Sequence, residues 1–455
     1  MGNNITIVGA GLAGSLLSVY LAKRGYTVDL YERRPDMRQV KISAGRSINL
    51  ALSTRGIHAL KEVGLFDEIS KILIPMKGRM MHGTDGAQTF VPYGKDDTEV
   101  INSVSRGELN MRLMSLAESF PGVKIHFNQR CTGMNFETGE VFFTNESNGE
   151  KHSIFSERVI GTDGSASALR SDMMRLNRFN YSQSYLEHAY KELTIPPAKN
   201  GSFRLEKNAL HIWPRKTFML IALPNIDASF TCTLFLSLEG PESFSTLDTP
   251  EKVTLFFKKY FSDALEQMPD LTNHFFENPT SSLMTVKSFP WSYEDKVVLL
   301  GDASHAIVPF FGQGMNCSFE DCSELNRFIG TYPGDWKKIF KEFEKSRKPN
   351  SDAIADLAVE NFYEMRDLVA DPRFLLKKKV EHILEEKFSD FFVPKYAMVT
   401  FHRIPYSVAM ERGKIQDIIL DEITTGIHDP HHVDIAIAEH LIKTRLTPWS
   451  DVVRL

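Results

Sequence analysis

The sequence predicts an α/β protein that starts with a Rossmann-like dinucleotide-binding domain, continues into a β-sheet domain and ends in a helical region. Residues 5–8 (ITIV) form an apolar run typical of a buried parallel strand, and a helix over 15–25 follows a glycine-rich turn. Between about 180 and 290, short β-rich runs are separated by turn residues such as Pro224-Asn225. From about residue 334 onwards the hydrophobic pattern becomes helical.

The glycines after the first strand are the strongest local indication of a ligand. Gly9, Gly11 and Gly14 have the spacing GxGxxG between strand and helix, and a second strand, TVDLY, ends at Glu32. In this arrangement the first glycine makes the tight turn, the second lets the backbone approach a pyrophosphate, and the third allows close helix–strand packing. The helix N-terminus offers free N–H groups to the phosphate, and we expect Glu32 to accept hydrogen bonds from ribose hydroxyls. The pattern therefore predicts a bound dinucleotide.

Two further strand ends indicate which dinucleotide binds. The run VIGTDGSASALR (159–170) places Asp163 at a strand end, and VVLLGDASHAIVPFFGQGMN (297–316) does the same for Asp302. Three strand ends that carry a glycine or an acid, spread over about 300 residues, indicate one long cofactor held by a discontinuous domain. Separate FAD and NAD(P) domains would need a second glycine fingerprint, and the sequence has none. These features favour FAD over NAD.

Length, charge and cysteine content exclude several classes of protein. A chain of 455 residues is too long for one hydrophobic core, so we expect two or three domains. The net charge of −5 argues against a nucleic-acid partner. Four cysteines without a CxxC pair are typical of the reducing cytoplasm. No apolar run reaches the roughly 18 residues of a membrane span, and no targeting segment precedes the first strand, so we expect a cytoplasmic protein with no membrane attachment.

The motifs around the three strand ends resemble those of a known family. GTDGSASALR resembles the Asp-Gly motif of the single-component flavoprotein aromatic hydroxylases, and GDASHAIVPFFGQGMNCSFEDCSEL resembles their Gly-Asp motif. Within that group, six blocks are similar to the kynurenine 3-monooxygenase family, in its soluble bacterial form. These blocks are GRSINLALSTRG (45–56), SVSRGELN (103–110), HIWPR (211–215), VPFFGQGMNCSFED (308–321), NFYEMRD (361–367) and MVTFHRIPYS (398–407).

The resemblance implies an FAD-dependent, NADPH-consuming monooxygenase of tryptophan degradation, which uses O₂ to convert L-kynurenine to 3-hydroxykynurenine through a flavin C4a-hydroperoxide. FAD is expected to be bound non-covalently, and NADPH to act as a co-substrate without a fingerprint of its own. The ring amine of kynurenine already donates electrons to the ortho carbon. We therefore expect flavin-centred chemistry with no catalytic side chain and no metal.

The residues expected to bind FAD lie in the matching blocks. Asp302 is expected to accept a hydrogen bond from a ribityl hydroxyl, and the backbone over 312–316 to lie along the flavin ring. A helix starting near Asn316 would favour negative charge on the reduced ring. The full predicted set is Gly9, Gly11, Ala13, Gly14, Tyr31, Glu32, Arg33, Arg34, Ala51, Arg106, Asp163, Asp302, Gly314, Met315 and Asn316.

The substrate residues follow from the chemistry of an aromatic amino acid and from the same blocks. Arginine binds both oxygens of a carboxylate through its planar fork, and the resemblance assigns this role to Arg79, with Tyr93 and Tyr396 as hydroxyl donors. Asn361 and Met365, four residues apart on one helix face, are expected to polarise and pack the substrate. The aromatic ring is expected to contact Pro309, Phe310, Ile221, Leu223, Thr233 and Phe235, although the last four are equally well explained as ordinary sheet core.

The expected architecture is a Rossmann-like FAD-binding domain of the aromatic-hydroxylase type in two parts, 1–176 and 288–370, with a substrate-side excursion near 75–100. A β-rich substrate domain fills 177–287, and a helical region fills 371–455. Three alternatives remain: a hydroxylase of another amino-aromatic acid, a flavin-binding sensor and a flavin-dependent halogenase. The halogenase would need a Trp-x-Trp-x-Ile-Pro stretch, and no two of the four tryptophans have that spacing.

Overall fold

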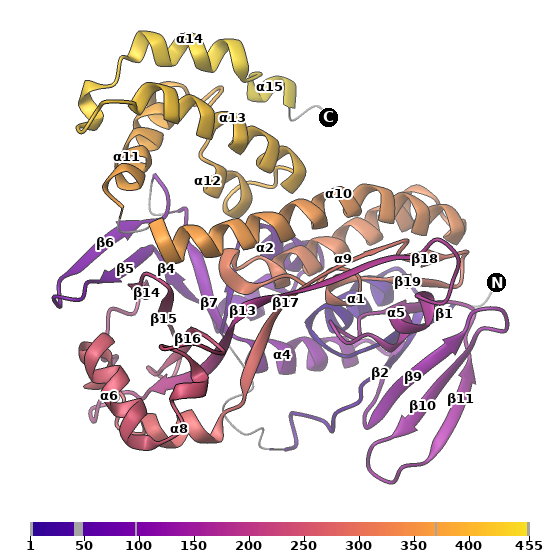
Figure 1. The fold of residues 1–455 in the computed structure, drawn as a ribbon. Helices are drawn as coiled ribbons and strands as arrows, with labels where there is room; N and C mark the ends of the chain where they lie inside the picture. Colours follow the sequence, from indigo (N-terminus) through magenta and orange to yellow (C-terminus); the bar gives the residue numbers. More distant parts are fainter. Residues whose placement is uncertain (1–2, 41–48, 96–97, 369–370, 453–455) are drawn as a thin grey trace.

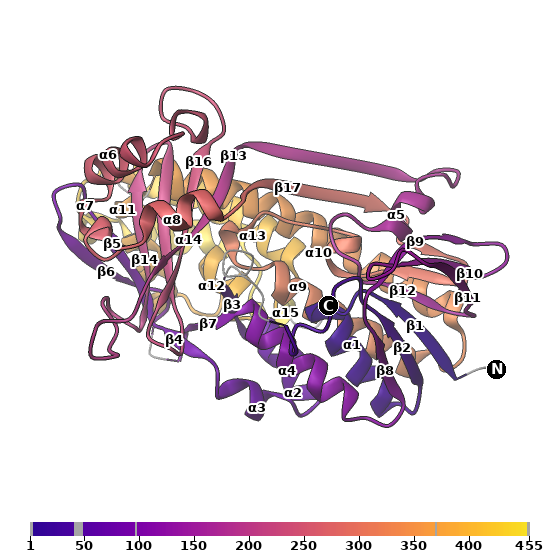
Figure 2. The same ribbon diagram turned by 90° about the horizontal axis from the view of Figure 1, so that it is seen from below.

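The structure, a computed structural model, has the predicted α/β fold (Figure 1). It describes residues 3–40, 49–95, 98–368 and 371–452, so residues 45–48 of the 45–56 block lie outside the described residues. Figure 2 shows one large sheet at each end of the molecule, with the long helices α9 (Gly314–Thr331) and α10 (Trp336–Tyr363) between them.

The six-stranded sheet contains the predicted glycine fingerprint. Its order is β18-β19-β12-β1-β2-β8, and all neighbours are parallel except β18. The strands are β1 (Asn4–Val8), β2 (Thr27–Tyr31), β8 (Val123–His126), β12 (Val159–Gly161), β18 (Ser292–Tyr293) and β19 (Val297–Leu299). Because parallel strands present their carboxyl ends at the same edge, Gly9, Glu32, Asp163 and Asp302 come to one side of the sheet.

Helices pack on this sheet and on one another. Helix α1 (Leu12–Lys23) contacts both α4 (Arg106–Glu118) and α9, and α2 (Thr54–Glu62) packs along α9. The prediction that the helix after the flavin loop starts near Asn316 was two residues late. The helix begins at Gly314, because the turn is already completed by Gly312 in the left-handed conformation (φ 66°).

The seven-stranded sheet forms the other end of the molecule, in the order β17-β13-β16-β15-β14-β5-β6. Its members are β5 (Gly78–His82), β6 (Gln88–Pro92), β13 (Asn180–Ile195), β14 (Ala209–Arg215), β15 (Phe218–Pro224), β16 (Phe230–Ser237) and β17 (Thr280–Phe289). Strand β5 pairs in parallel with β14, so the segment around residue 80 joins a sheet formed mostly by residues after 180. The division into domains at 176, 287 and 370 stays a prediction.

One face of this sheet is covered by helices that the sequence analysis missed. The β-rich prediction for 180–290 overlooked α6 (Pro250–Tyr260), α7 (Ser262–Leu265) and α8 (Leu271–Glu277). Val253, Phe256 and Phe257 follow helical spacing and pack with Leu234 and Leu236 of β16. The helices seal this face, so the opposite face of the sheet is the one available to a ligand.

The C-terminal helices are α11 (Pro372–Lys387), α12 (Lys395–Thr400), α13 (Tyr406–Thr424), α14 (Ile435–Arg445) and α15 (Trp449–Val452). Helices α11, α13 and α14 pack around a core of their own, and α13 rests on α10 (Figure 1). Within the described ranges, no helix combines the length and apolarity that a membrane span requires.

Two small sheets and short helices complete the fold. One sheet has the order β3-β7-β4 and the other β11-β10-β9. The remaining elements are β3 (Asn49–Leu52), α3 (Phe66–Ser70), β4 (Ile74–Met76), β7 (Ile101–Ser105), β9 (Gln129–Asn135), β10 (Glu140–Asn145), β11 (Lys151–Phe155), α5 (Ala168–Met173) and a π-helical turn over Glu364–Leu368.

Candidate functional site

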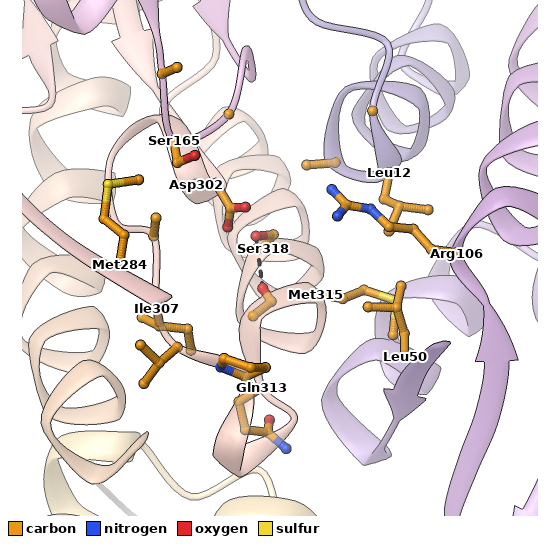
Figure 3. A pocket seen from close by; sticks show the side chains of 18 of the residues that line it. Leu12, Leu50, Arg106, Ser165, Met284, Asp302, Ile307, Gln313, Met315 and Ser318 are labelled. Atoms are coloured by element: carbon orange, nitrogen blue, oxygen red, sulfur yellow. Dashed lines mark hydrogen bonds between the residues drawn. The ribbon is translucent and has the colours of Figure 1, made fainter. Parts of the chain in front are cut away.

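A cavity of about 980 Å³ extends from the carboxyl edge of the six-stranded sheet to the open face of the seven-stranded sheet. Figure 3 shows part of its lining, with Leu12 and Arg106 on one side and Ser165, Asp302 and Met284 on the other. All predicted site residues line this cavity except Gly14, Asn316 and Asn361. The structure therefore brings together side chains from the N-terminal fingerprint, the β-rich sheet and the C-terminal helix α12.

The fingerprint glycines have the close contacts that the motif requires. A Cβ on Gly14 would stand 2.0 Å from the Gly9 carbonyl oxygen and 2.6 Å from Thr162 Oγ1, so Gly14 lies outside the cavity because it packs α1 against the strands. Gly9 has φ +102°, and its Cβ would meet the Thr162 carbonyl oxygen at 2.5 Å. A Cβ on Gly11 would meet nothing within 4 Å, which leaves the backbone open to the cavity. This geometry suits a pyrophosphate at the N-terminus of α1.

Glu32 is buried at the end of β2 and fixes two loops. Its Oε2 accepts a hydrogen bond from the Ala10 amide at 3.0 Å, and its Oε1 accepts one from the Arg34 amide at 3.0 Å. Each carboxylate oxygen can accept a second hydrogen bond. The side chain therefore retains acceptor capacity for ribose hydroxyls in the cavity that it lines.

Asp163 and Asp302 give the middle of the cavity its acidic groups. Oδ2 of Asp163 accepts a hydrogen bond from the Ala168 amide at 2.8 Å, whereas its Oδ1 is buried without a partner in the described structure. Burial raises the pKa of the Asp163 carboxyl. In Figure 3 Asp302 points into the cavity and faces Leu12 and Arg106. An unpartnered buried oxygen and an acid facing open space fit a ligand rich in hydroxyls, as FAD is.

Asn316 positions the walls of the cavity and does not line it. Its Oδ1 accepts from the Ser53 amide at 2.9 Å, and its Nδ2 donates to the carbonyls of Ala51 and Gly312, both at 2.8 Å. These bonds join the loop over 309–313 to strand β3. The Asn316 side chain is fully buried, so only its backbone is left for the predicted cofactor contact.

A buried charge network lies beneath the loop that carries Asp302. Asp321 Oδ2 accepts from the Gly301 amide at 3.1 Å and lies 2.7 Å from His305 Nε2, and Asp321 Oδ1 accepts from Arg347 at 2.7 Å. Arg347 also pairs with Glu320, which pairs in turn with Arg55 at 2.6 Å. Burial opposes these charges, but the neighbouring cations hold the pKa of both carboxyls below the ordinary range. His305 is thus engaged by the network.

Removing one acid of this network is expected to destabilise the protein. Asp321→Asn removes the negative charge that contacts Arg347 and His305. The free energy of unfolding should therefore fall by about 3 kcal/mol at pH 7. The Asp321 carboxyl has a lowered pKa, so its contribution is complete above the ordinary pKa of about 4 and is lost as the pH falls below that value. The melting temperature of Asp321→Asn should therefore lie well below wild type at pH 7, and the difference should be smaller at pH 3. Asp356→Asn is the control, because Asp356 forms an exposed ion pair with Lys287. If Asp321→Asn lowers the melting temperature equally at pH 7 and pH 3, the expectation is contradicted.

The far end of the cavity is formed by an arginine that lies beside two stacked tyrosines. The guanidinium carbon of Arg79 lies 5.3 Å from the ring centre of Tyr93 and 5.0 Å from that of Tyr396, and the two rings stack at 5.6 Å. Arg79 Nε and the Tyr93 hydroxyl are buried without a hydrogen-bond partner in the described structure. Burial raises the pKa of both phenols, which keeps them protonated donors. The buried guanidinium of Arg79, with tyrosine hydroxyls as further donors beside it, is suited to bind an anion such as a carboxylate.

Aromatic side chains separate this end from the fingerprint end. Phe310 packs between Phe235 at 4.8 Å and Phe362 at 4.5 Å, and Ile221 stands beside Thr233 on the neighbouring strand. These groups form an apolar slot for a flat ring.

The contact of Asn361 with the substrate stays a prediction. Its Nδ2 donates to the Phe310 carbonyl at 2.6 Å, so it supports Phe310 from behind and does not face the large cavity. Met365, one turn later, lines the cavity from the π-helical turn.

Several cavity residues were missed by the sequence analysis. Alternation along the strands could have found Met219, two residues before Ile221, and helical spacing could have found Thr400, four residues after Tyr396. Some missed residues stand inside motifs that had been identified, such as Leu12, Ser165 and Gln313, whereas others come from loops and strands outside every motif. The further lining residues include Leu12, Leu50, Gln129, Arg130, Cys131, Thr132, Ser165, Tyr190, Leu210, Met284, Gln313 and Thr400.

Comparison with known proteins agrees with this geometry. Residues 3–228 and 267–357 match the family described as FAD binding domain. The chain is 52% identical over 447 residues to the kynurenine 3-monooxygenase of Myxococcus xanthus, covering 98% of this chain and 96% of the relative. It is 50% identical over 456 residues to that of Dictyostelium discoideum, covering 97% and 98%.

Solved structures show the same fold at low identity. The tetrameric form of 2-methyl-3-hydroxypyridine-5-carboxylic acid oxygenase superposes with a TM-score of 0.65 at 18% identity, covering 82% of this chain and 94% of that one. The p-nitrophenol 4-monooxygenase of Pseudomonas putida DLL-E4 gives 0.63 at 16% identity, covering 93% and 98%. With a family match over more than half of its length and close relatives over nearly all of it, the chain belongs to the kynurenine 3-monooxygenases, flavin-dependent enzymes built on this FAD binding domain.

Proposed function

We propose that the protein hydroxylates L-kynurenine at the ring carbon next to the amine, consuming O₂ and NADPH and releasing 3-hydroxykynurenine, NADP⁺ and water. The observation that carries this proposal is one continuous cavity, with a dinucleotide fingerprint at one end and a buried arginine beside two stacked tyrosines at the other. The relatives' name supports the choice of substrate over other amino-aromatic acids.

The cofactor half of the cavity is proposed to hold FAD without a covalent link. Gly9, Gly11 and Ala13 would place the pyrophosphate at the N-terminus of α1, and Glu32 the adenosine ribose. Asp302 would accept from a ribityl hydroxyl, and the backbone from Gly314 onwards would lie along the ring. Tyr31, Arg33, Arg34, Ala51, Arg106, Asp163 and Met315 complete this half of the lining.

The substrate half is proposed to hold the amino acid by its carboxylate and its ring. Arg79 would bind the carboxylate through two parallel hydrogen bonds, with the hydroxyls of Tyr93 and Tyr396 donating beside it. Phe235, Phe310 and Ile221 would hold the aniline ring flat, and Pro309, Leu223, Thr233 and Met365 would close the slot around it.

Chemistry in this cavity depends on positioning and on the exclusion of water. When bound, FAD supplies the redox chemistry that takes a hydride from NADPH and places one oxygen atom of O₂ on the ring. The protein holds the target carbon toward the cofactor by fixing both ends of the substrate. The apolar side chains around Phe310 keep water from the reacting centre. The ring amine activates its own ortho carbon, so no side chain is required as a strong base.

The test is NADPH oxidation by the FAD-loaded protein with and without L-kynurenine, with the product identified by mass. We expect kynurenine to stimulate oxidation and to gain one oxygen atom. Binding of FAD with no stimulated oxidation would indicate a flavin-binding sensor. Faster turnover of another amino-aromatic acid would indicate a different hydroxylase.

We also propose a cytoplasmic location with no nucleic-acid or membrane partner. The four cysteines are free, and three of them are buried, which suits a reducing compartment. Expression in the native host followed by fractionation tests this location.

A further inference from the structure

Thr400 has a buried hydroxyl without a hydrogen-bond partner. The residue is 1% exposed, lines the cavity, and its Oγ1 makes no hydrogen bond in the described structure. Threonines within helices commonly bond to the carbonyl four residues earlier, as Thr254, Thr331 and Thr424 do here at 2.8, 2.9 and 2.6 Å. Thr400 forgoes this bond although Tyr396 stands four residues before it in the same helix. An unsatisfied buried hydroxyl is unfavourable, so a partner is expected when the cavity is filled.

The helix that carries Thr400 is firmly held. Arg55 Nε donates to the Val399 carbonyl at 3.2 Å, and its Nη2 donates to the Ile404 carbonyl. The same guanidinium pairs with Glu320 and lies 3.8 Å from the ring centre of Tyr406. Arg55 is 1% exposed, so these bonds are shielded from water. The orientation of Thr400 is therefore set by a fixed backbone.

The neighbours of Thr400 in the cavity are hydrogen-bond donors. Burial raises the pKa of the Tyr396 phenol, and a side-chain hydrogen-bond interaction with Thr400 opposes this rise, so the two hydroxyls lie close together, although Thr400 Oγ1 makes no hydrogen bond of full geometry. Tyr93 and Arg79 also interact with Tyr396, and the Tyr93 hydroxyl and Arg79 Nε share with Thr400 the lack of a hydrogen-bond partner. Arg79 can only donate, and each hydroxyl has a hydrogen to place. Four adjacent donors are best satisfied by one group with several lone pairs and a negative charge.

We propose that the Thr400 hydroxyl donates a hydrogen bond to the α-carboxylate of the substrate, next to Arg79, Tyr93 and Tyr396. A carboxylate accepts about four hydrogen bonds, so it can take one from Thr400 together with two from Arg79 and one from a tyrosine. The inference rests on the proposed function, because the carboxylate belongs to L-kynurenine. It assigns a substrate contact to the C-terminal helical region beyond Tyr396.

The test measures binding to the FAD-loaded protein by calorimetry, with three ligands. L-kynurenine has both the carboxylate and the ammonium, 4-(2-aminophenyl)-4-oxobutanoate has only the carboxylate, and kynuramine has only the ammonium. Thr400→Val keeps the shape and removes the hydroxyl, whereas Thr400→Ser keeps the hydroxyl. Thr424→Val removes a buried helical hydroxyl that already has its own partner outside the cavity, and it serves as the matched control.

We expect Thr400→Val to weaken both carboxylate ligands by about 10–100-fold and to change kynuramine binding by less than about twofold. Thr400→Ser and Thr424→Val should bind all three ligands nearly as wild type does, and all variants should retain FAD. Equal losses for kynuramine would overturn the inference, since the hydroxyl would then only shape the cavity. Unchanged binding of the carboxylate ligands would also overturn it. If wild type fails to bind L-kynurenine at all, the proposed function is wrong and the inference falls with it.

Discussion

Arg79→Ala is expected to lower kcat/KM for L-kynurenine by about 10²–10³-fold, because the substrate carboxylate is left in a buried site without its cation. Arg79 lies beside two stacked tyrosines, with its Nε buried and unpartnered in the described structure. The remaining hydroxyls of Tyr93 and Tyr396 can donate but cannot neutralise the charge. Steady-state kinetics with flavin occupancy recorded for each variant measures the effect.

Arg79→Lys is the informative companion variant. An ammonium keeps the charge but lacks the planar fork, so only part of the activity should return. FAD content should be unchanged in both variants, since Arg79 stands at the end of the cavity away from the fingerprint. Arg327→Ala, at a half-exposed pair with Glu324, is the matched control and should have wild-type kinetics. A loss below about threefold for Arg79→Ala would mean that the carboxylate is held elsewhere.

Gly314→Val is expected to abolish FAD binding while leaving the fold intact. A Cβ on Gly314 would meet only Ile307 Cγ1, at 3.8 Å, so the added side chain extends into the cavity. The protein itself therefore tolerates the valine, whereas a flavin ring lying along this backbone would not. Flavin content after purification and far-UV circular dichroism are the two measurements.

Gly330→Val in the same helix provides the control for this substitution. Gly330 is exposed at the far end of α9, and its Cβ would stand 2.9 Å from Arg24 Nη2, so the bond from this guanidinium to the Asn326 carbonyl must shift at the surface, away from the cavity. We expect this variant to bind FAD normally. If Gly314→Val also retains full flavin and full turnover, the cofactor ring does not lie along this segment.

Local patterns in the sequence were enough to predict the cofactor end of the cavity. The strand–glycine–helix order places Gly9, Gly11 and Glu32 within one βαβ unit, where neighbouring residues decide the backbone geometry. The parallel strands β12 and β19 then bring Asp163 and Asp302 to the same edge. The structure places all of these residues on one cavity, while their contacts with FAD stay a prediction.

The substrate end could not be derived from local patterns. Arg79 has no periodicity that marks it, and it was predicted only through the resemblance to the family. It reaches the cavity because β5 pairs with β14, about 130 residues later in the chain. Tyr396 and Thr400 reach the same place because Arg55 holds α12 against the cofactor domain.

The sequence by itself determined the α/β class and the dinucleotide fingerprint, because short-range periodicity and glycine geometry depend on neighbouring positions, whereas fewer than half of the cavity residues were predicted. Tertiary structure alone decided that Asn361 supports Phe310 from behind, that Asn316 joins Ala51 to Gly312, and that three helices seal one face of the β-rich sheet. Each of these depends on pairing between segments far apart in the chain. Such contacts depend on how whole helices and strands pack together, so the sequence of neither segment shows a periodicity that predicts them.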